Sequence, residues 1–169
     1  CGRCDQCLIG APQRCRGAEP HGLLGVAFDG GMADRMRVPT QCLVPLPDGL
    51  AVRDASLVEP LAVSWHALGA VHAVAGERVL VVGGGSVGLL TVAAARAMGL
   101  EVDLDARHDH QREAGGRLGA GAPRGRYEIV VEAAGTDSAL AACVERAEPA
   151  GRIAMVGVAH QDRAIPGIG

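Results

Sequence analysis

The sequence predicts an α/β fold, with a parallel sheet over residues 56–169 and an irregular, β-rich region over residues 1–55. From about residue 55 onward, short apolar strand patterns alternate with helical ones, as in parallel sheets whose strands are joined by crossover helices. Only three residues are Phe, Trp or Tyr, although 49% of the chain is hydrophobic. Val, Leu, Ile and Ala must therefore form the core, which suits strands that are buried on both faces.

Turn signals dominate the first region. The DGG triplet at residues 29–31 and the Pro- and Gly-containing run at residues 45–49 predict short strands joined by irregular segments. An apolar helical stretch follows over residues 57–71, and Asp54 is its expected N-cap residue. This helix should lead into the second region.

Strands and helices alternate in the second region. Strands are expected at residues 78–82, 102–105, 127–132 and 152–157, and helices at residues 89–98, 111–118 and 138–146. Each connection is then a crossover, so the sheet is expected to be parallel.

Charge and hydropathy argue against several classes of function. The net charge is −3 and all 16 basic residues are Arg, so nothing suggests a basic surface for nucleic acid. No apolar run reaches the roughly 18 residues that a membrane span needs, and no signal peptide is visible. We therefore expect a soluble, cytoplasmic protein. Because the chain starts at Cys1, inside a cysteine motif and without Met, we also expect it to be a fragment.

Four cysteines, Cys1, Cys4, Cys7 and Cys15, have the spacing C-x2-C-x2-C-x7-C. Four thiolates so close in sequence can surround one Zn²⁺, and such a closed site is structural because it has no open position for chemistry. An iron–sulfur cluster uses similar spacing, but the bacterial motif ends C-x3-C-P. Paired disulfides or free thiols are also compatible with the spacing, and structural zinc is favoured over both. The remaining cysteines lack ligand spacing and are expected to be core or surface thiols: Cys42 and Cys143.

A G-x-G-x-x-G motif at Gly83, Gly85 and Gly88 directly follows the first predicted strand. In a dinucleotide-binding turn the first glycine permits the turn, the second lets a diphosphate approach, and the third lets the helix pack closely. The helix N-terminus, at Ser86 and Val87, would offer free N–H groups to the phosphates. The alternative is a Gly-rich turn with a purely structural role.

The end of the second strand bears on the choice between NAD and NADP. Aligned on the downstream Leu-Gly-Ala segment, the usual acidic position is occupied by Ala106. Ala106 would leave room for a 2′-phosphate, with which Arg107 could pair, so NADP is predicted. A slip of one residue would place Asp105 on the ribose and favour NAD instead, and a solvated surface role is the alternative for Arg107.

The segment CGRCDQCLIGAPQRC resembles the structural-zinc loop of the medium-chain zinc alcohol dehydrogenases, including the sorbitol and threonine dehydrogenase branch. Further matches follow in the family's order: FDGGMADRMRVP, LVPLPDGL, LVEPLAVSWHAL, VLVVGGGSVG, IVVEAAG and EPAGRIAMVGV. The resemblance covers nearly the whole chain. It implies the end of a GroES-like catalytic domain with its zinc lobe over residues 1–55, and a Rossmann-type domain, truncated at its C-terminus, over residues 56–169.

The resemblance also implies a mechanism. Hydride passes between an alcohol or polyol and a nicotinamide cofactor, while a second, catalytic zinc lowers the pKa of the alcohol. Glu59 matches the family's last residue at that ion, although the helix dipole alone would favour a first-turn glutamate. Val63 would lie near the nicotinamide, as would the loop containing Ala133 and Gly135. Trp65 is expected to be a packing residue, with the edge of the substrate cleft as its alternative position, and His66 and His72 are expected to be packing or surface residues instead of ligands.

The chain departs from the family pattern in three places. The upstream Cys and His-Glu ligands of the catalytic zinc are absent, so the chain alone is not expected to bind that ion or to turn over. Only residues 121–126 stand where the family has another strand and helix, and the chain ends before the family's last strand. The retained sheet is expected to have the order 2-1-4-5, with exposed edges.

The leading interpretation is an alcohol or polyol dehydrogenase that uses zinc and NADP, with NAD as the second choice, on a small-molecule alcohol. A non-catalytic dinucleotide-binding sensor or scaffold with a structural zinc is the alternative. Upstream Cys and His-Glu ligands in the complete protein would favour the enzyme. A zinc-ribbon module for nucleic acid is disfavoured by the negative charge and the few aromatic residues. The family implies a homodimer or homotetramer.

Overall fold

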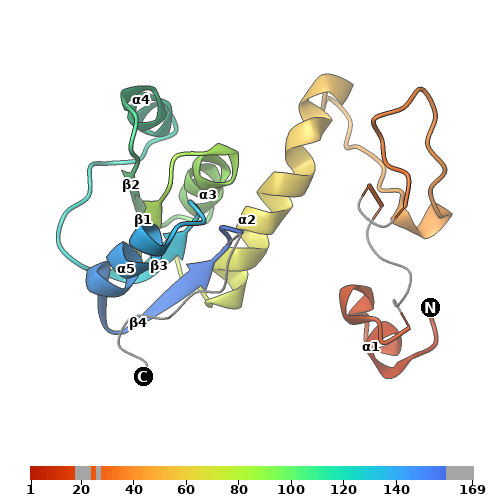
Figure 1. The fold of residues 1–169 in the computed structure, drawn as a ribbon, viewed down its shortest axis with the longest axis horizontal. Helices are drawn as coiled ribbons and strands as arrows, with labels where there is room; N and C mark the ends of the chain where they lie inside the picture. Colours follow the sequence, from red (N-terminus) through yellow and green to blue (C-terminus); the bar gives the residue numbers. More distant parts are fainter. Residues whose placement is uncertain (18–23, 26–27, 159–169) are drawn as a thin grey trace. The chain divides into compact units, whose positions relative to one another are not determined.

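The computed structural model describes residues 1–17, 24–25 and 28–158 (Figure 1). Internal contacts divide the chain into two units, Cys1–Pro47 and Asp48–Gly169. This division falls before the expected boundary at residues 55/56. The reason is local, because the 3-10 segment η3 (Val52–Leu57) packs against helix α2 (Val58–Ala70) of the second unit.

The first unit contains little regular structure. Its elements are the short helix α1 (Asp5–Leu8) and the 3-10 turns η1 (Pro12–Arg14) and η2 (Thr40–Cys42). The expected short strands do not form among its described residues, where the only strand-like feature is an isolated bridge between Leu24 and Phe28. A strand requires a neighbour to pair its backbone groups, and the described part of this unit supplies none beyond that bridge.

The start of α2 differs from the prediction. Asp54 lies inside η3 and is not the N-cap, which is Leu57 with helical φ and ψ of −84° and −13°. The 3-10 turns run directly into the α-helix, and no side chain caps it. The residues of η3 continue the helical backbone, so their carbonyl groups stand where a capping side chain would otherwise be needed. The helix itself covers most of the expected stretch.

The second unit is built on a four-stranded parallel sheet. Its strands are β1 (Arg78–Val82), β2 (Glu101–Asp105), β3 (Tyr127–Glu132) and β4 (Ala147–Met155). Their order is β2-β1-β3-β4. This confirms the expected order 2-1-4-5, which uses the family's strand numbers, since β3 and β4 correspond to the family's strands 4 and 5. The connecting helices are α3 (Ser86–Ala97), α4 (Asp109–Arg117) and α5 (Asp137–Arg146). The α/β fold class is therefore confirmed.

Strand β4 is displaced from its expected range of 152–157. Tyr127 pairs with Ala147 before an irregularity in register, and regular pairing then resumes between Ile129 and Arg152. At the other end, the N–H groups of Val156 and Gly157 both donate to the carbonyl of Glu132, so the regular ladder stops there. The irregularity adds an early segment to the strand, and the shared carbonyl shortens it at its end.

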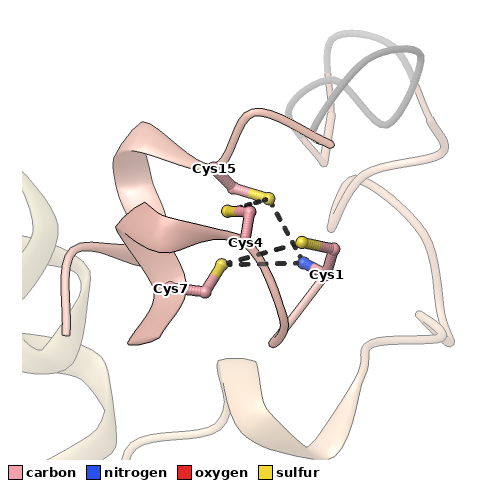
Figure 2. A group of neighbouring side chains, drawn as sticks. All are labelled: Cys1, Cys4, Cys7 and Cys15. Carbon is pink, nitrogen blue, oxygen red and sulfur yellow. Dashed lines mark hydrogen bonds between the residues drawn. The ribbon is translucent and has the colours of Figure 1, made fainter. Parts of the chain in front are cut away.

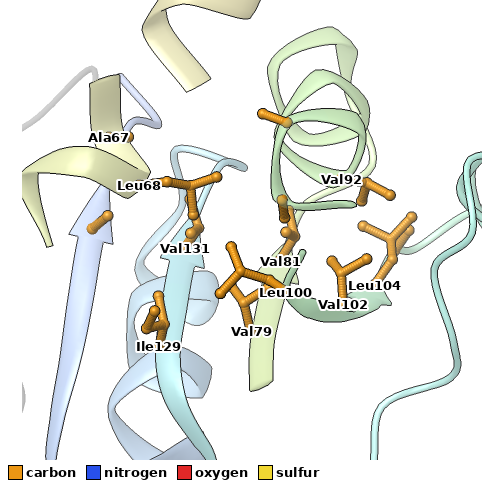
Figure 3. Packing of buried hydrophobic residues seen from close by; sticks show 14 residues of the cluster. Ala67, Leu68, Val79, Val81, Val92, Leu100, Val102, Leu104, Ile129 and Val131 are labelled. Carbon is orange, nitrogen blue, oxygen red and sulfur yellow. The ribbon is translucent and has the colours of Figure 1, made fainter. Parts of the chain in front are cut away.

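Alternating strand residues form two apolar layers, one on each face of the sheet. On one face, Val79, Val81, Ile129 and Val131 pack beneath α2 and α3, as Figure 3 shows. On the other face, buried strand residues pack against Ala139 and Cys143 of α5. These strand residues are Leu80, Val82, Tyr127 and Val130. Apart from Tyr127, the large buried hydrophobic side chains are aliphatic, as the composition predicts. None of the helices in the described part of the chain has the length and apolar content that a bilayer crossing requires.

Candidate functional sites

The four N-terminal cysteines converge on one point (Figure 2). Their sulfur atoms all lie within 4.8 Å of one another, with 4.0 Å between Cys1 and Cys7 and 4.0 Å between Cys4 and Cys15. Zn–S bonds of about 2.3 Å in a tetrahedron require sulfur atoms separated by roughly 3.8 Å. The cluster therefore has the size and donor chemistry of a Zn(Cys)₄ site.

Local backbone structure brings these cysteines together. Helix α1 starts immediately after Cys4 and contains Cys7, and the turn η1 ends just before Cys15. Gly2 and Gly10 have φ values of 71° and 78°, a conformation that favours glycine. Arg16 donates to both carboxylate oxygens of Asp5, at 2.8 and 3.1 Å, which connects the two ends of the loop.

The thiols differ in acidity. Backbone N–H groups of Cys7 and Arg16 are the main reason that the pKa of Cys4 is lowered, to about 6. A backbone N–H of Gly2 acts in the same direction on Cys7, but the neighbouring Cys4 and Cys15 and desolvation together raise the pKa of Cys7. Cys4 thus offers a thiolate at neutral pH, which is the form that binds a metal ion.

The six cysteines carry free thiols in this structure. The expected surface and core positions of the two non-clustered thiols are confirmed, since Cys42 is exposed and Cys143 is buried. Burial, followed by the negative charges of Glu132 and Asp105, raises the pKa of Cys143 to about 12. Cys143 is therefore a packing residue with an unreactive thiol.

The glycine motif forms the turn between β1 and α3. Gly83 has φ of 115°, and a Cβ there would lie 2.8 Å from the carbonyl carbon of Ala133. A Cβ at Gly88 would overlap the carbonyl oxygen of Gly83, whereas a Cβ at Gly85 would meet nothing within 4 Å. Two of the glycines therefore permit close packing, and Gly85 faces open space. Helix α3 begins at Ser86, before the apolar stretch at residues 89–98, so Gly88 lies within its first turn.

Gly84, which the motif leaves unassigned, is also sterically restricted. A Cβ there would lie 2.7 Å from the Cβ atoms of both Ala106 and Gln111. A glycine at a variable motif position was the only available sign of this contact. It joins the glycine turn to the segment after β2.

A cleft of about 460 Å³ opens at the carboxyl ends of β1, β2 and β3. We call it the strand-end cleft. It lies between the ends of β1 and β3, after which the chain crosses opposite faces of the sheet through α3 and α5, and this is the usual ligand position in open α/β folds. At its base, Gly85 precedes α3 and no side chain caps that helix, whose first N–H groups are therefore available to an anion. Its lining residues are Val82, Gly83, Gly84, Gly85, Asp105, Arg107, His108, Gln111, Ala133, Ala134, Thr136, Ser138, Ala139 and Ala142.

The three residues at the end of β2 point in different directions. Ala106 is buried against Gly84 and does not line the strand-end cleft. Asp105 and Arg107 both line it, and the carbonyl of Asp105 accepts from Gly83 N at 2.8 Å. Arg112 donates to the carbonyl of Arg107 at 3.0 Å, which helps to hold this segment in place. The cleft therefore presents both an acidic and a basic side chain at this end.

Glu59 and Val63 lie elsewhere, along a separate cavity of about 590 Å³ between α2 and β4. Glu59 is exposed and Val63 is 38% exposed. His66 also lines this cavity, while Trp65 is 50% exposed and lines neither space. Within the described residues, only the cysteine cluster gathers three or more side chains that could ligate a metal. Glu59 and Val63 thus line the same cavity. Glu59 belongs to no set of metal ligands there, and the glycine turn lies in the other cleft.

Two buried polar features near the strand-end cleft were not singled out from the sequence. One is the hydroxyl pair of Ser64 on α2 and Thr91 on α3, whose oxygen atoms are 3.1 Å apart and which both approach the carbonyl of Val87. The other is Glu132, fully buried at the end of β3. Each residue is an isolated polar position in an apolar run, and this is the only sequence signal that could have identified it.

Comparison with known proteins finds dehydrogenases among the sequences and structures that are similar to this chain. Residues 55–146 match the family described as "Alanine dehydrogenase/PNT, C-terminal domain". An uncharacterized zinc-type alcohol dehydrogenase-like protein of Haemophilus influenzae is 30% identical over 98% of this chain and 53% of its own length. L-galactonate-5-dehydrogenase of Escherichia coli is 37% identical over 65% of this chain and 32% of its own length. The chain spans about half the length of the curated relatives that it matches from end to end.

Solved structures agree. A protein assigned as a zinc-binding dehydrogenase, from Sinorhizobium meliloti and bound to NADP, superposes with a TM-score of 0.84 at 30% identity, covering 98% of this chain and 53% of that one. An Escherichia coli protein described as a short chain alcohol dehydrogenase, complexed with NADH, gives 0.85 at 26% identity, covering 98% and 53%. The match to the alanine dehydrogenase family covers only part of the second unit, whereas these relatives extend over both units and are therefore the more informative comparison.

Proposed function

The chain belongs to the medium-chain, zinc-type alcohol and polyol dehydrogenases, and from this premise we propose that the whole protein transfers a hydride between an alcohol or polyol and a nicotinamide cofactor. The observation that carries the proposal is the turn at residues 83–88, which opens into the strand-end cleft at the N-terminus of α3. We also propose that residues 1–55 are the end of a GroES-like catalytic domain and residues 56–169 a Rossmann domain.

The residues of the cleft fit a dinucleotide. Gly85 leaves space where a diphosphate would approach, and Ser86 and Val87 would donate backbone N–H groups from the positive end of α3. Ala133 and Gly135 would hold the nicotinamide end of the cofactor from the loop after β3. Val63 lines the separate cavity beside α2, and its place near the nicotinamide is proposed from the family resemblance alone. When bound, the nicotinamide supplies the hydride chemistry, while these residues fix its position and exclude water.

The cysteine cluster fits a structural zinc ion. Four sulfur donors at tetrahedral separations and a lowered pKa at Cys4 favour Zn²⁺ over a hard cation, and four thiolates would leave no position for substrate. For a catalytic ion the fit fails within the described residues, because Glu59 is exposed and belongs to no group there of three or more side chains that could ligate a metal. Glu59 is proposed as a ligand of a catalytic ion only together with residues elsewhere in the whole protein.

Substitution of Gly85 tests the cofactor assignment. Alanine fits the backbone there, since φ is −76°, and its methyl group would project into open space instead of into the core. Gly85→Ala should therefore weaken binding of NADP and NAD by roughly tenfold or more without lowering the melting temperature. Titration calorimetry measures the affinities, and Gly116→Ala, at an open position on α4, is the control. Unchanged affinity in Gly85→Ala would argue against the assignment.

We propose NADP as the preferred cofactor. Support comes from Arg107, which lines the strand-end cleft, and from Ala106, which is buried beside it and places no carboxylate there. Asp105 supports the competing choice of NAD, and similar structures hold NADP in one case and NADH in another. Arg107→Ala should weaken NADP binding by roughly tenfold and leave NAD binding unchanged, since only NADP carries the 2′-phosphate. A stronger affinity of the unmodified protein for NAD would contradict the proposal.

A non-catalytic dinucleotide sensor is the second candidate. It is favoured by the isolation of Glu59, since the described residues assemble a cleft and a closed ion site but no reaction centre. Turnover of an alcohol by the whole protein, loaded with zinc and NADP, would exclude this candidate. For the enzyme we further propose a cytoplasmic location and a homodimer or homotetramer, as the family resemblance implies.

A further inference from the structure

We propose that Glu132 is a positioning residue that fixes the loop at residues 133–135 against the glycine turn, and so sets the shape of the strand-end cleft. This inference rests on the proposed cofactor function. Glu132 is the last residue of β3 and its side chain is fully buried, although burying a carboxylate is costly unless it is hydrogen-bonded.

The hydrogen bonds of Glu132 connect three segments. Its Oε1 atom accepts from the backbone N–H groups of Ala134, at 3.0 Å, and Gly135, at 2.7 Å. Its backbone carbonyl accepts from Val156 and Gly157, both at 2.9 Å. One residue therefore holds the loop after β3 and the segment after β4 together.

Close packing transmits this arrangement to the glycine turn. Gly83 packs so tightly on the loop that a Cβ would lie 2.8 Å from Ala134 N and from the carbonyl carbon of Ala133. On the opposite side, a Cβ at Gly157 would overlap Glu132 Oε2 and Gly135 N. The loop is thus packed between Gly83 and Gly157, and a shift in its position would displace either the turn or the segment after β4.

The other end of the loop is also held. Thr136, which follows the loop, caps α5 by accepting from Ala139 N at 3.2 Å, and this hydrogen bond ties the end of the loop to the first turn of α5. An apolar residue in place of Glu132 would remove the acceptor of two part-buried N–H groups, and the loop would have to turn these groups toward solvent in the cleft. Ala133 and Ala134 line that cleft, so the rotation would change its wall.

The test compares two ligands that reach different lengths of the cleft. AMP requires only the adenosine end, whereas ADP-ribose also requires the diphosphate turn and the loop after β3. Glu132→Leu should weaken ADP-ribose binding by about tenfold or more and AMP binding by less than about twofold, because the change is confined to the loop end. Glu132→Gln keeps an accepting oxygen and should retain much of the lost affinity. Glu145→Gln, on the exposed face of α5, is the matched control.

A second variant covers the case in which Glu132→Leu does not fold. Gly157→Ala keeps the carboxylate but forces a methyl group against it, and it should also weaken ADP-ribose more than AMP. Equal weakening of both ligands, or equal affinity in Glu132→Leu and Glu132→Gln, would overturn the inference. If the unmodified protein binds neither ligand, the proposed function fails. If it binds both and the variants bind like it, only the role of Glu132 fails.

Discussion

The two units of the protein are stabilised by different means. In the first unit no described side chain is buried, yet four sulfur atoms lie within 4.8 Å of one another. In the second unit two apolar layers enclose a parallel sheet, and residues such as Leu68, Val79 and Ile129 are completely buried. A small segment without a core requires a metal ion or another cross-link, whereas a sheet covered on both faces is stabilised by burial itself. The contrast indicates that metal and core can be removed separately.

Removal of zinc should have the largest effect, and only on the first unit. Structural zinc in small domains contributes on the order of 10–16 kcal/mol of apparent binding energy, which is folding energy where no core exists. Chelation, or Cys7→Ser, should therefore make the residues around α1 and η1 sensitive to protease, while the thermal transition of the second unit stays unchanged. Limited proteolysis with mass spectrometry locates the cleavage, and Cys42→Ser is the control. A protected first unit after zinc loss would contradict the contrast.

Truncation of the core should affect only the second unit. Leu68 is fully buried between α2 and the sheet, so Leu68→Ala should lower the free energy of unfolding by about 2–5 kcal/mol. Urea denaturation measures the loss, and zinc content measured in parallel should not change. Val74→Ala, at a residue that is 63% exposed, should have little effect. A fall in bound zinc in Leu68→Ala would show that the units are coupled.

A smaller effect is expected at the polar end of the sheet. The buried Tyr127 hydroxyl donates to Asp103 Oδ2 at 2.8 Å and accepts from Arg124 N at 2.6 Å. Tyr127→Phe should lower the free energy of unfolding, measured by urea denaturation, by about 1–3 kcal/mol, because Asp103 loses its hydroxyl donor.

Alkaline pH provides a second measurement of the same residue. Burial first, and then Asp103, raise the pKa of Tyr127 above its ordinary value of 10.0. The unfolded chain then ionises before the folded one, so the stability due to Tyr127 is complete below pH 10 and is lost as pH rises through the folded pKa. Tyr127→Phe should flatten this alkaline decline in urea midpoints. An unchanged slope would contradict the burial of an un-ionised Tyr127.

The smallest effect is expected at the N-terminus of α5. Thr136→Ala removes the side-chain cap on Ala139 N and should cost about 1 kcal/mol in the second unit alone. Ser138→Ala, which removes a hydroxyl 3.2 Å from the Thr136 hydroxyl and leaves the cap itself in place, is the control. Equal losses in both variants would mean that the cap contributes nothing specific.

Local signals explain why much of the fold was predictable. Strands β1 and β3 are built around short apolar runs, and their bounds agree with the prediction. The cysteine spacing identified a cluster that the structure brings together. The glycine motif likewise combined a strand, a turn and a helix in consecutive residues. In each case the information lies within a few neighbouring residues, so no tertiary contact had to be known.

Features that depend on distant partners were missed. Asp is a residue type that often caps helices, but Asp54 lies inside the 3-10 segment before α2, and Leu57 is the N-cap. The expected strands of the first unit did not form among its described residues, because a strand depends on a neighbour. Glu132 acquires its role from Gly157 and Gly83, which are remote in sequence and approach it only in the folded chain.

The hydroxyl pair of Ser64 and Thr91 has a consequence for motion. It joins α2 to α3 at a buried point beside the carbonyl of Val87, within the first turn of α3. Opening either helix would expose unsatisfied polar groups on the other, so their amides should exchange hydrogen for deuterium as one cooperative unit. The helix that precedes the sheet in sequence would then fluctuate together with the helix that presents its N-terminus to the ligand.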